Sequence, residues 1–188
     1  MKMEGKKILI LSPHTDDETL GCGGFMNKLS KNNDISVVCF SYCDREDLKK
    51  EFINACLTID EDIEIGILDF KVRYFDRQEV LDVLVKLKTK INPDVIICPS
   101  SFDIHQDHQV VYNESVRAFK DKTILGYCHH WNVIGISDLR LTVKLDEDDI
   151  RIKNLAMDKY ESQYHREYFK DRVWIGNEEK FEVVLWKY

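Results

Sequence analysis

Short apolar runs that alternate with stretches of helical periodicity constrain the fold of this chain more than any other feature. The runs have the length and composition of buried strands and lie at residues 7–11, 35–40, 63–68, 94–98 and 123–128. Between them, apolar residues recur at helical spacing, most clearly over 48–56 and over 80–91, where Pro93 ends the pattern. This alternation predicts an α/β fold with a mostly parallel, doubly wound sheet, in which the carboxyl ends of the strands share one edge.

The last part of the sequence is less regular. Apolar residues at helical spacing over 152–160 predict a final helix, and residues 181–186 predict a closing strand. A chain of 188 residues with 44% hydrophobic content can bury one sizeable core, and it contains no linker, repeat or low-complexity segment. We therefore expect one domain that spans residues 1–188.

Composition excludes several classes of protein. The 27 basic and 34 acidic residues give a net charge of −7 without any long run of Lys or Arg, so nucleic acid is not an expected partner. The N-terminal apolar run is far too short for a membrane span or a signal peptide, so we expect a cytoplasmic protein that does not bind membranes. Six cysteines without a CxxC pair do not predict a disulfide framework. The sequence leaves a homo-oligomer open.

Residues of the types that bind metals follow the first apolar run. They form the string Pro13-His14-Thr15-Asp16-Asp17-Glu18. The carboxyl ends of strands are where α/β enzymes keep their chemistry. His14 and Asp17 are three residues apart, so in a tight turn that enters a helix both can converge on one point, while Asp16 projects to another side. The three acidic residues alone would fit a helix cap equally well, because negative charge is favoured at a helix N-terminus.

A second string, His105-Gln106-Asp107-His108, follows the apolar run 95–98 in the same strand-then-loop context. His105 and His108 are spaced i, i+3 at the start of a predicted helix, so one can bind a metal while the other faces a substrate. Asp107 can hold an imidazole N–H from behind. Together the two strings predict a metal site formed by His14, Asp17 and His108.

This set of ligands has a defined chemistry. Two imidazoles and a carboxylate suit Zn²⁺, and also Fe²⁺, and leave a position open for water. Bound Zn²⁺ lowers the pKa of its water to about 7, and Asp16 is the nearest unligated carboxylate that can act as general base. A protonated His105 is the candidate to stabilise an oxyanion. Cys22 is an alternative ligand or nucleophile, although catalytic zinc sites usually need only three protein ligands.

The two strings resemble the PHPDDE and HPDH motifs of the PIG-L/LmbE-like zinc-dependent N-deacetylases, with Thr15 in place of the second Pro of the first motif. Shorter likenesses extend the resemblance over nearly the whole chain, as far as Phe181-Glu182. The resemblance implies a Rossmann-like three-layer sandwich and N-acetylated amino sugars or N-acetylglucosamine glycosides as substrates. It also implies zinc ligands at His14, Asp17 and His108, and catalytic roles for Asp16 and His105.

Three alternatives to this interpretation stay open: a non-sugar amide, an ester, or a catalytically silent metal-binding module. Arg73 follows the third predicted strand and is either a ligand for sugar hydroxyls or phosphate or a solvated arginine. Residues 127–132 offer an aromatic face for a sugar ring, or else core or oligomer packing. The segment 171–180 differs from the C-terminal block of many bacterial relatives, and we expect it to shape the pocket.

Overall fold

A computed structural model describes residues 3–129, 131–135, 137–172 and 175–187 of the chain. The strands are β1 (Lys7–His14), β2 (Asp34–Ser41), β3 (Glu64–Ile67), β4 (Val95–Pro99), β5 (Thr123–Tyr127), β6 (Arg140–Lys144) and β7 (Glu178–Leu185). The helices are α1 (Asp17–Ser30), α2 (Glu46–Ile59), α3 (Arg77–Ile91), α4 (Gln106–Ala118), α5 (Glu147–Met157) and α6 (Glu167–Lys170), and a 3₁₀ turn, η1, spans Glu161–Gln163. The strands form one sheet in the order β3-β2-β1-β4-β5-β7-β6.

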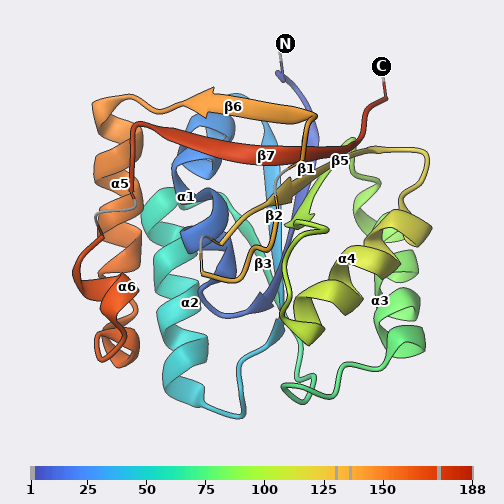
Figure 1. Cartoon of the computed structure of the whole chain (residues 1–188), viewed down its shortest axis with the longest axis horizontal. Coiled ribbons are helices and arrows are strands. Elements are labelled where there is room, and N and C mark those ends of the chain that lie inside the picture. Colours follow the sequence, from blue (N-terminus) through green and yellow to red (C-terminus); the bar gives the residue numbers. More distant parts are fainter. Residues whose placement is uncertain (1–2, 130, 136, 173–174, 188) are drawn as a thin grey trace.

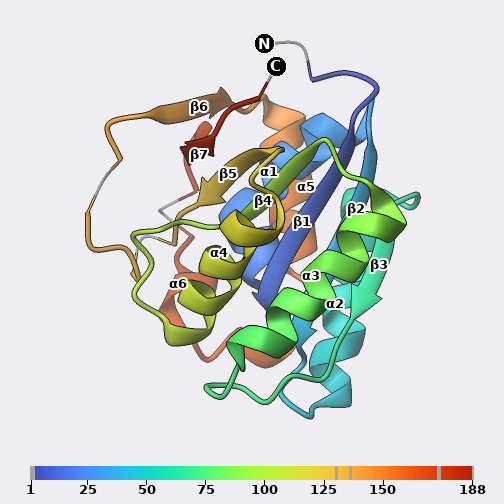
Figure 2. The same cartoon turned by 90° about the vertical axis from the view of Figure 1, so that its right-hand side faces the viewer.

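The predicted α/β class is confirmed. Strands β1 to β5 pair in parallel, with β1 between β2 and β4. Helices α1, α2 and α5 cover one face of the sheet and α3 and α4 cover the other, which makes three layers (Figure 1). In Figure 2 the view is turned so that α3 and α4 lie in front of the sheet. The carboxyl ends of β1 and β4, from which both histidine strings continue, are neighbours at one edge.

Successive residues of β1 face opposite layers, because side chains alternate along a strand. Ile8 and Ile10 pack into the core beneath α1, α2 and α5, whereas Leu9 and Leu11 pack into the core beneath α3 and α4. Burial on both faces explains why this strand and its neighbours appear in the sequence as continuous apolar runs.

The C-terminal part of the sheet departs from the prediction. Strand β7 is antiparallel to both β5 and β6, and it begins three residues before the predicted range of 181–186. Strand β6 was not predicted. It is an edge strand whose alternate residues are exposed, so its five residues contain only two apolar ones and resemble a loop in composition.

Helix α1 is bent at Cys22, whose φ of −149° and ψ of 20° are not helical. A buried ion pair from the C-terminal part satisfies the backbone groups at this bend. Lys153 Nζ lies 2.6 Å from Glu179 Oε1 and donates to the Leu20 carbonyl at 2.9 Å, while Glu179 accepts from the N–H groups of Gly24 and Phe25. The Lys153–Glu179 pair therefore fixes the bend and, through the Leu20 carbonyl, the first turn of α1.

Gly21 belongs to the same close packing. A Cβ atom at this position would lie 2.4 Å from a ring carbon of Tyr127, so only glycine fits without displacing the ring. Cys22 itself is completely buried in the core, and burial raises the pKa of its thiol well above the ordinary value. That environment suits a packing residue rather than a metal ligand or a nucleophile. In the described part of the chain, no helix combines the length and the apolar character needed to span a bilayer.

Candidate functional site

The two histidine strings meet at the carboxyl edge of the sheet. His14 ends β1, and Asp17 begins α1 three residues later. His105 caps the N-terminus of α4, and His108 lies in the first turn of that helix. The ring centroid of His14 lies 5.0 Å from that of His105 and 5.3 Å from that of His108.

Three of these side chains direct one atom each toward a common point. His14 Nδ1 lies 3.2 Å from Asp17 Oδ2, His108 Nε2 lies 3.1 Å from the same oxygen, and the two nitrogens are 3.3 Å apart. Tetrahedral zinc with bonds of about 2.0–2.1 Å places its ligand atoms about 3.3 Å from one another. The spacing and the donor types of His14, Asp17 and His108 therefore fit one zinc-sized cation.

A carboxylate orients each of the two imidazoles from behind. Asp107 Oδ2 accepts a hydrogen bond from His14 Nε2 at 3.0 Å, and Asp103 Oδ2 accepts one from His108 Nδ1 at 2.8 Å. These bonds leave the opposite nitrogen of each ring with its lone pair toward the common point, as in carboxylate–histidine–metal groups. Asp107 was the predicted partner; Asp103 was not, although it stands only two residues before the second string.

The pKa values of His14, Asp17 and His108 show that the point between them strongly favours positive charge. Burial lowers the pKa of His14, but hydrogen bonds to Asp107 and Asp17 outweigh it and raise the pKa to about 9. Burial likewise opposes the protonation of His108, yet the charge of Asp17 and the bond to Asp103 raise its pKa to about 10. The pKa of Asp17 lies well below its ordinary value, despite burial, because both histidines face it. Protons and a divalent cation would compete for the same point.

Asp16 takes a different position from Asp17, as the sequence predicts. Its side chain lines the same pocket, and only 8% of the residue is exposed. Burial and the negative charge of Asp17 raise its pKa to about 7, while the charge of Arg166 acts in the opposite direction. A carboxylate with a pKa near the working pH is suited to accept and return a proton.

Glu18, the last acidic residue of the first string, faces the interior. Its oxygens accept hydrogen bonds from Ser12 Oγ and Thr19 Oγ1, each at 2.7 Å, and from Tyr160 Oη at 2.6 Å. All of these groups are buried, so Glu18 ties the turn to the core rather than facing a ligand.

His105 is half-buried and lines the pocket. Burial, with the nearby charges of His108 and His14, lowers its pKa, so the ring is neutral near pH 7. Its Nδ1 accepts a hydrogen bond from the Asp107 backbone N–H at 3.3 Å. The remaining nitrogen, Nε2, therefore carries the proton. This differs from the protonated imidazole expected from the sequence, although a neutral Nε2–H can also donate to an oxyanion.

A further histidine, His129 after β5, was missed as a site residue. It is 98% buried, with 2% relative exposure; its Nε2 donates to the Asp17 carbonyl at 3.1 Å, and its Nδ1 lies 3.6 Å from Asp17 Oδ1. Trp131 stacks on its ring with an interplanar angle of 5°. Within the predicted aromatic face, Tyr127 is buried and donates to the Leu11 carbonyl, which leaves Trp131 as the aromatic residue at the pocket. His130 lies outside the described residues.

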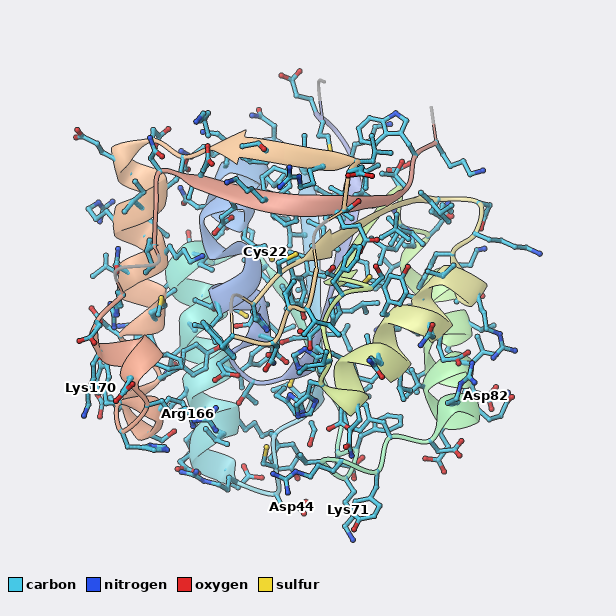
Figure 3. All side chains as sticks on the ribbon, viewed as in Figure 1. Cys22, Asp44, Lys71, Asp82, Arg166 and Lys170 are labelled. Carbon is cyan, nitrogen blue, oxygen red and sulfur yellow. The ribbon has the colours of Figure 1, made fainter. Side chains whose placement is uncertain are left out.

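The pocket above these groups has a volume of about 210 Å³. Besides the histidines and aspartates, its lining includes Arg73, Trp131, Gln163 and Arg166. Figure 3 shows Arg166 beside α2 and α6, with Asp44 and Lys71 on neighbouring loops toward the same end of the molecule. A larger hollow, of about 630 Å³, lies at the amino-terminal ends of the strands, where its lining includes Lys7, Asp34 and Glu64. Its lining contains none of the histidines or aspartates of the site.

The segment 171–180 does not line the metal-facing pocket in its described residues. Residues 175–180 instead line a neighbouring hollow of about 330 Å³, which shares Leu20 and Trp131 with the pocket. Among the described residues of this segment, the expected contribution to the pocket is therefore replaced by a contribution to the adjoining hollow. Val173 and Trp174 lie outside the described residues.

The fold and the site together define an α/β protein with a two-histidine, one-aspartate metal-type site at the carboxyl edge of a parallel sheet. A family model described as "PIG-L: GlcNAc-PI de-N-acetylase" matches residues 9–119, which is more than half of the chain. The chain belongs to this family. The matched region contains both histidine strings, and therefore His14, Asp17 and His108.

Known proteins add to this assignment. The chain is 26% identical over 136 residues to the probable N-acetyl-alpha-D-glucosaminyl L-malate deacetylase 2 of Bacillus subtilis (strain 168); the match covers 61% of this chain and 61% of that relative. The solved structure of the A40926 pseudoaglycone deacetylase Dbv21 superposes with a TM-score of 0.78 at 13% identity, covering 96% of this chain and 97% of that one. GalB, the 4-carboxy-2-hydroxymuconate hydratase of Pseudomonas putida KT2440, reaches 0.74 at 14% identity, with 97% and 98% covered. The fold is therefore shared by different reactions, and the site must decide between them.

Proposed function

We propose that this protein is a metal-dependent N-deacetylase that hydrolyses the acetamide of a small amino-sugar-type substrate, such as an N-acetylglucosamine glycoside, as one domain over residues 1–188. The observation that carries the proposal is the triangle of His14 Nδ1, Asp17 Oδ2 and His108 Nε2, with the separate carboxylate of Asp16 in the same pocket. Membership of a family described as a de-N-acetylase and the name of the Bacillus relative support the choice of reaction and of an N-acetylglucosamine-type substrate.

In this proposal His14, Asp17 and His108 hold the cation, with Zn²⁺ as the first choice and Fe²⁺ as the alternative. When bound, such an ion lowers the pKa of water and polarises a carbonyl group. Asp107 and Asp103 keep the two imidazoles in the tautomers that direct their lone pairs inward.

The proton transfers fall to the chain's own residues. The Asp16 carboxylate accepts a proton from the water that attacks the amide carbon and passes it to the departing nitrogen, which yields acetate and a free amine. His105 donates its Nε2–H to the carbonyl oxygen as negative charge develops there. Arg73 and Trp131 lie where they can contact the rest of the substrate, the first by hydrogen bonds and the second by stacking on a sugar ring.

The test is acetate release by purified protein that carries a measured amount of Zn²⁺ or Fe²⁺. We expect release from N-acetylglucosamine glycosides, and loss of release after chelation that returns when metal is added. Matched amide and ester substrates without a sugar distinguish a hydrolase of another specificity. A protein that binds one ion per chain and releases acetate from none of these substrates would be a silent metal-binding module, and the proposal would be wrong.

A further inference from the structure

Two guanidinium groups reach the same small pocket from different parts of the chain. Arg73 lies in the loop between β3 and α3, and Arg166 lies between η1 and α6, and both line the pocket of about 210 Å³ that contains His14 and His105. The chain as a whole has a net charge of −7, so these two arginines are a local feature of the pocket and not part of a generally basic surface. Arginine is the side chain best suited to bind carboxylate or phosphate oxygens in pairs.

The backbone of Arg73 is held in an uncommon conformation. Its φ is +67°, in the left-handed region that residues with a Cβ rarely occupy. Its N–H donates to Asp107 Oδ2 at 2.8 Å, and its carbonyl accepts from Gln106 Nε2 at 2.7 Å. Both bonds come from the second histidine string, and Asp107 Oδ2 also accepts from His14. The loop that carries Arg73 is therefore fixed directly to the metal-facing residues.

The bond from Gln106 to the Arg73 loop depends on the glutamine side chain. The corresponding position of the HPDH motif is proline, which has no side-chain donor and could not bond to the Arg73 carbonyl. Gln106 is the first residue of α4, a position where proline is well tolerated, so the fold does not require glutamine. What glutamine adds here is the bond to the Arg73 loop.

We propose that Arg73 and Arg166 form a subsite for a negatively charged group of the substrate, a carboxylate or phosphate attached to the acetamido sugar, and that Gln106 is a positioning residue for Arg73. The guanidinium of Arg73 is exposed, and among the described residues no acidic side chain pairs with it. The inference rests on the proposed deacetylase function and narrows its substrate class to anionic sugars.

The first experiment compares anionic substrates with neutral ones. The pair is the carboxymethyl glycoside of N-acetylglucosamine and its carboxamide, with N-acetylglucosamine 1-phosphate and the methyl glycoside as the phosphate arm. We expect kcat/KM for an anionic member to exceed that of its neutral partner by about tenfold or more, mainly through KM, because each arginine contact is charge-assisted. The better of the two anions identifies the group that the subsite prefers.

Variants of the chain then test which residues cause the preference for anionic substrates. Arg73→Gln and Arg166→Gln should each lower the ratio of anionic to neutral kcat/KM by about tenfold. Gln106→Pro should lower the same ratio while the metal content stays that of the wild type. Arg151→Gln is the matched control, because Arg151 lies on the exposed face of α5, paired with Asp148. If Arg166 acted only on the ionisation of Asp16, its replacement would change both substrates equally, and the ratio would not move.

A binding measurement separates this inference from the deacetylase proposal. Calorimetric titration with the anionic and neutral glucosamine glycosides, the products of the reaction, needs no turnover. Tighter binding of the anion that is lost in Arg73→Gln and Arg166→Gln supports the subsite even if acetate is never released. Equal binding and equal turnover of both members would overturn the subsite, while acetate release would still uphold the deacetylase.

Discussion

The site is built by two regions of the chain that contribute in different ways. The region matched by the family model, residues 9–119, contains the residues that in the proposed function hold a cation and act on the amide. The region after residue 119 adds residues such as Trp131 and Arg166 to the pocket wall, but its other contributions are supports, and three of these donate hydrogen bonds to one short turn. His129 donates to the Asp17 carbonyl, Tyr160 to the Glu18 carboxylate and Lys153 to the Leu20 carbonyl.

This difference shows how a reactive turn is kept in place. Residues 16–20 bring three carboxylates close together at the start of a helix, and like charges at this distance repel. Hydrogen bonds from a second, sequence-distant region hold the turn, so Asp16 and Asp17 can face the pocket while Glu18 is fixed in the interior. Variants of the two regions should therefore fail differently: the first in metal binding and chemistry, the second in stability and alignment.

The largest effect is expected from His14→Ala in the first region. Loss of a direct ligand should weaken zinc binding by more than about 100-fold, which exceeds the loss expected when a residue that only hydrogen-bonds to a ligand is replaced. Acetate release should become undetectable. Metal analysis after dialysis and an acetate assay measure both. His165→Ala, which removes an exposed histidine bonded to the Ser162 carbonyl, is the control and should retain both properties. Full metal content in His14→Ala would remove His14 from the site.

Asp16→Asn should separate chemistry from metal binding. The amide cannot accept the proton that the carboxylate would, so kcat should fall by about 10²- to 10⁴-fold while zinc content is unchanged. Single-turnover acetate release with metal-loaded protein gives the comparison. The control is Asp44→Asn, on an exposed loop at the same end of the molecule. Wild-type turnover in Asp16→Asn would contradict the role of Asp16 as general base.

The two regions also differ in how far their sequences reveal them. Strands β1, β2, β4 and β5 are buried and paired on both sides, so their apolar runs are nearly continuous, whereas β3 is a short, partly buried edge strand. Helices α2 and α3 between them show one apolar stripe each. Each histidine string is a continuous segment of four to six residues, so its metal-type side chains can be recognised directly in the sequence. The class of fold and the set of residues that converge at the site could therefore be predicted.

The supports could not be predicted in the same way, because each depends on a contact between distant residues. His129 is not spaced from the other histidines as metal ligands usually are. Lys153 and Glu179 are charged residues that sequence analysis would place on the surface, and only the fold brings them to the backbone groups at the bend of α1. Strand β6 is an exposed edge whose alternation is too short to distinguish from a loop. Of these supports, only Asp103 could have been suggested by the sequence, because it is an acidic residue two positions before a histidine string.

Lys153→Met tests the second region through stability. The substitution leaves the Glu179 carboxylate buried without its ion-pair partner and the Leu20 carbonyl without this donor, so the free energy of unfolding should fall by about 3–5 kcal/mol. Urea denaturation monitored by circular dichroism measures it. Lys144→Met is the matched control, because Lys144 forms a pair of the same length with Glu178 but on the surface, where ion pairs contribute little. Equal losses in the two variants would show that burial of the Lys153 pair has no special weight.

Asp103→Asn should have the smallest of these effects, and it tests the point where the two regions join. A β-bridge pairs Asp103 with Val133, so the later region sets the position of the carboxylate that orients His108. An amide oxygen still accepts from His108 Nδ1 but without charge, and zinc affinity should fall by about 10- to 100-fold. Competition with a chelator measures the affinity, and Asp138→Asn, an exposed carboxylate, should leave it unchanged. If Asp103→Asn bound zinc as tightly as the wild type, the later region would support the turn of α1 but not the second histidine string.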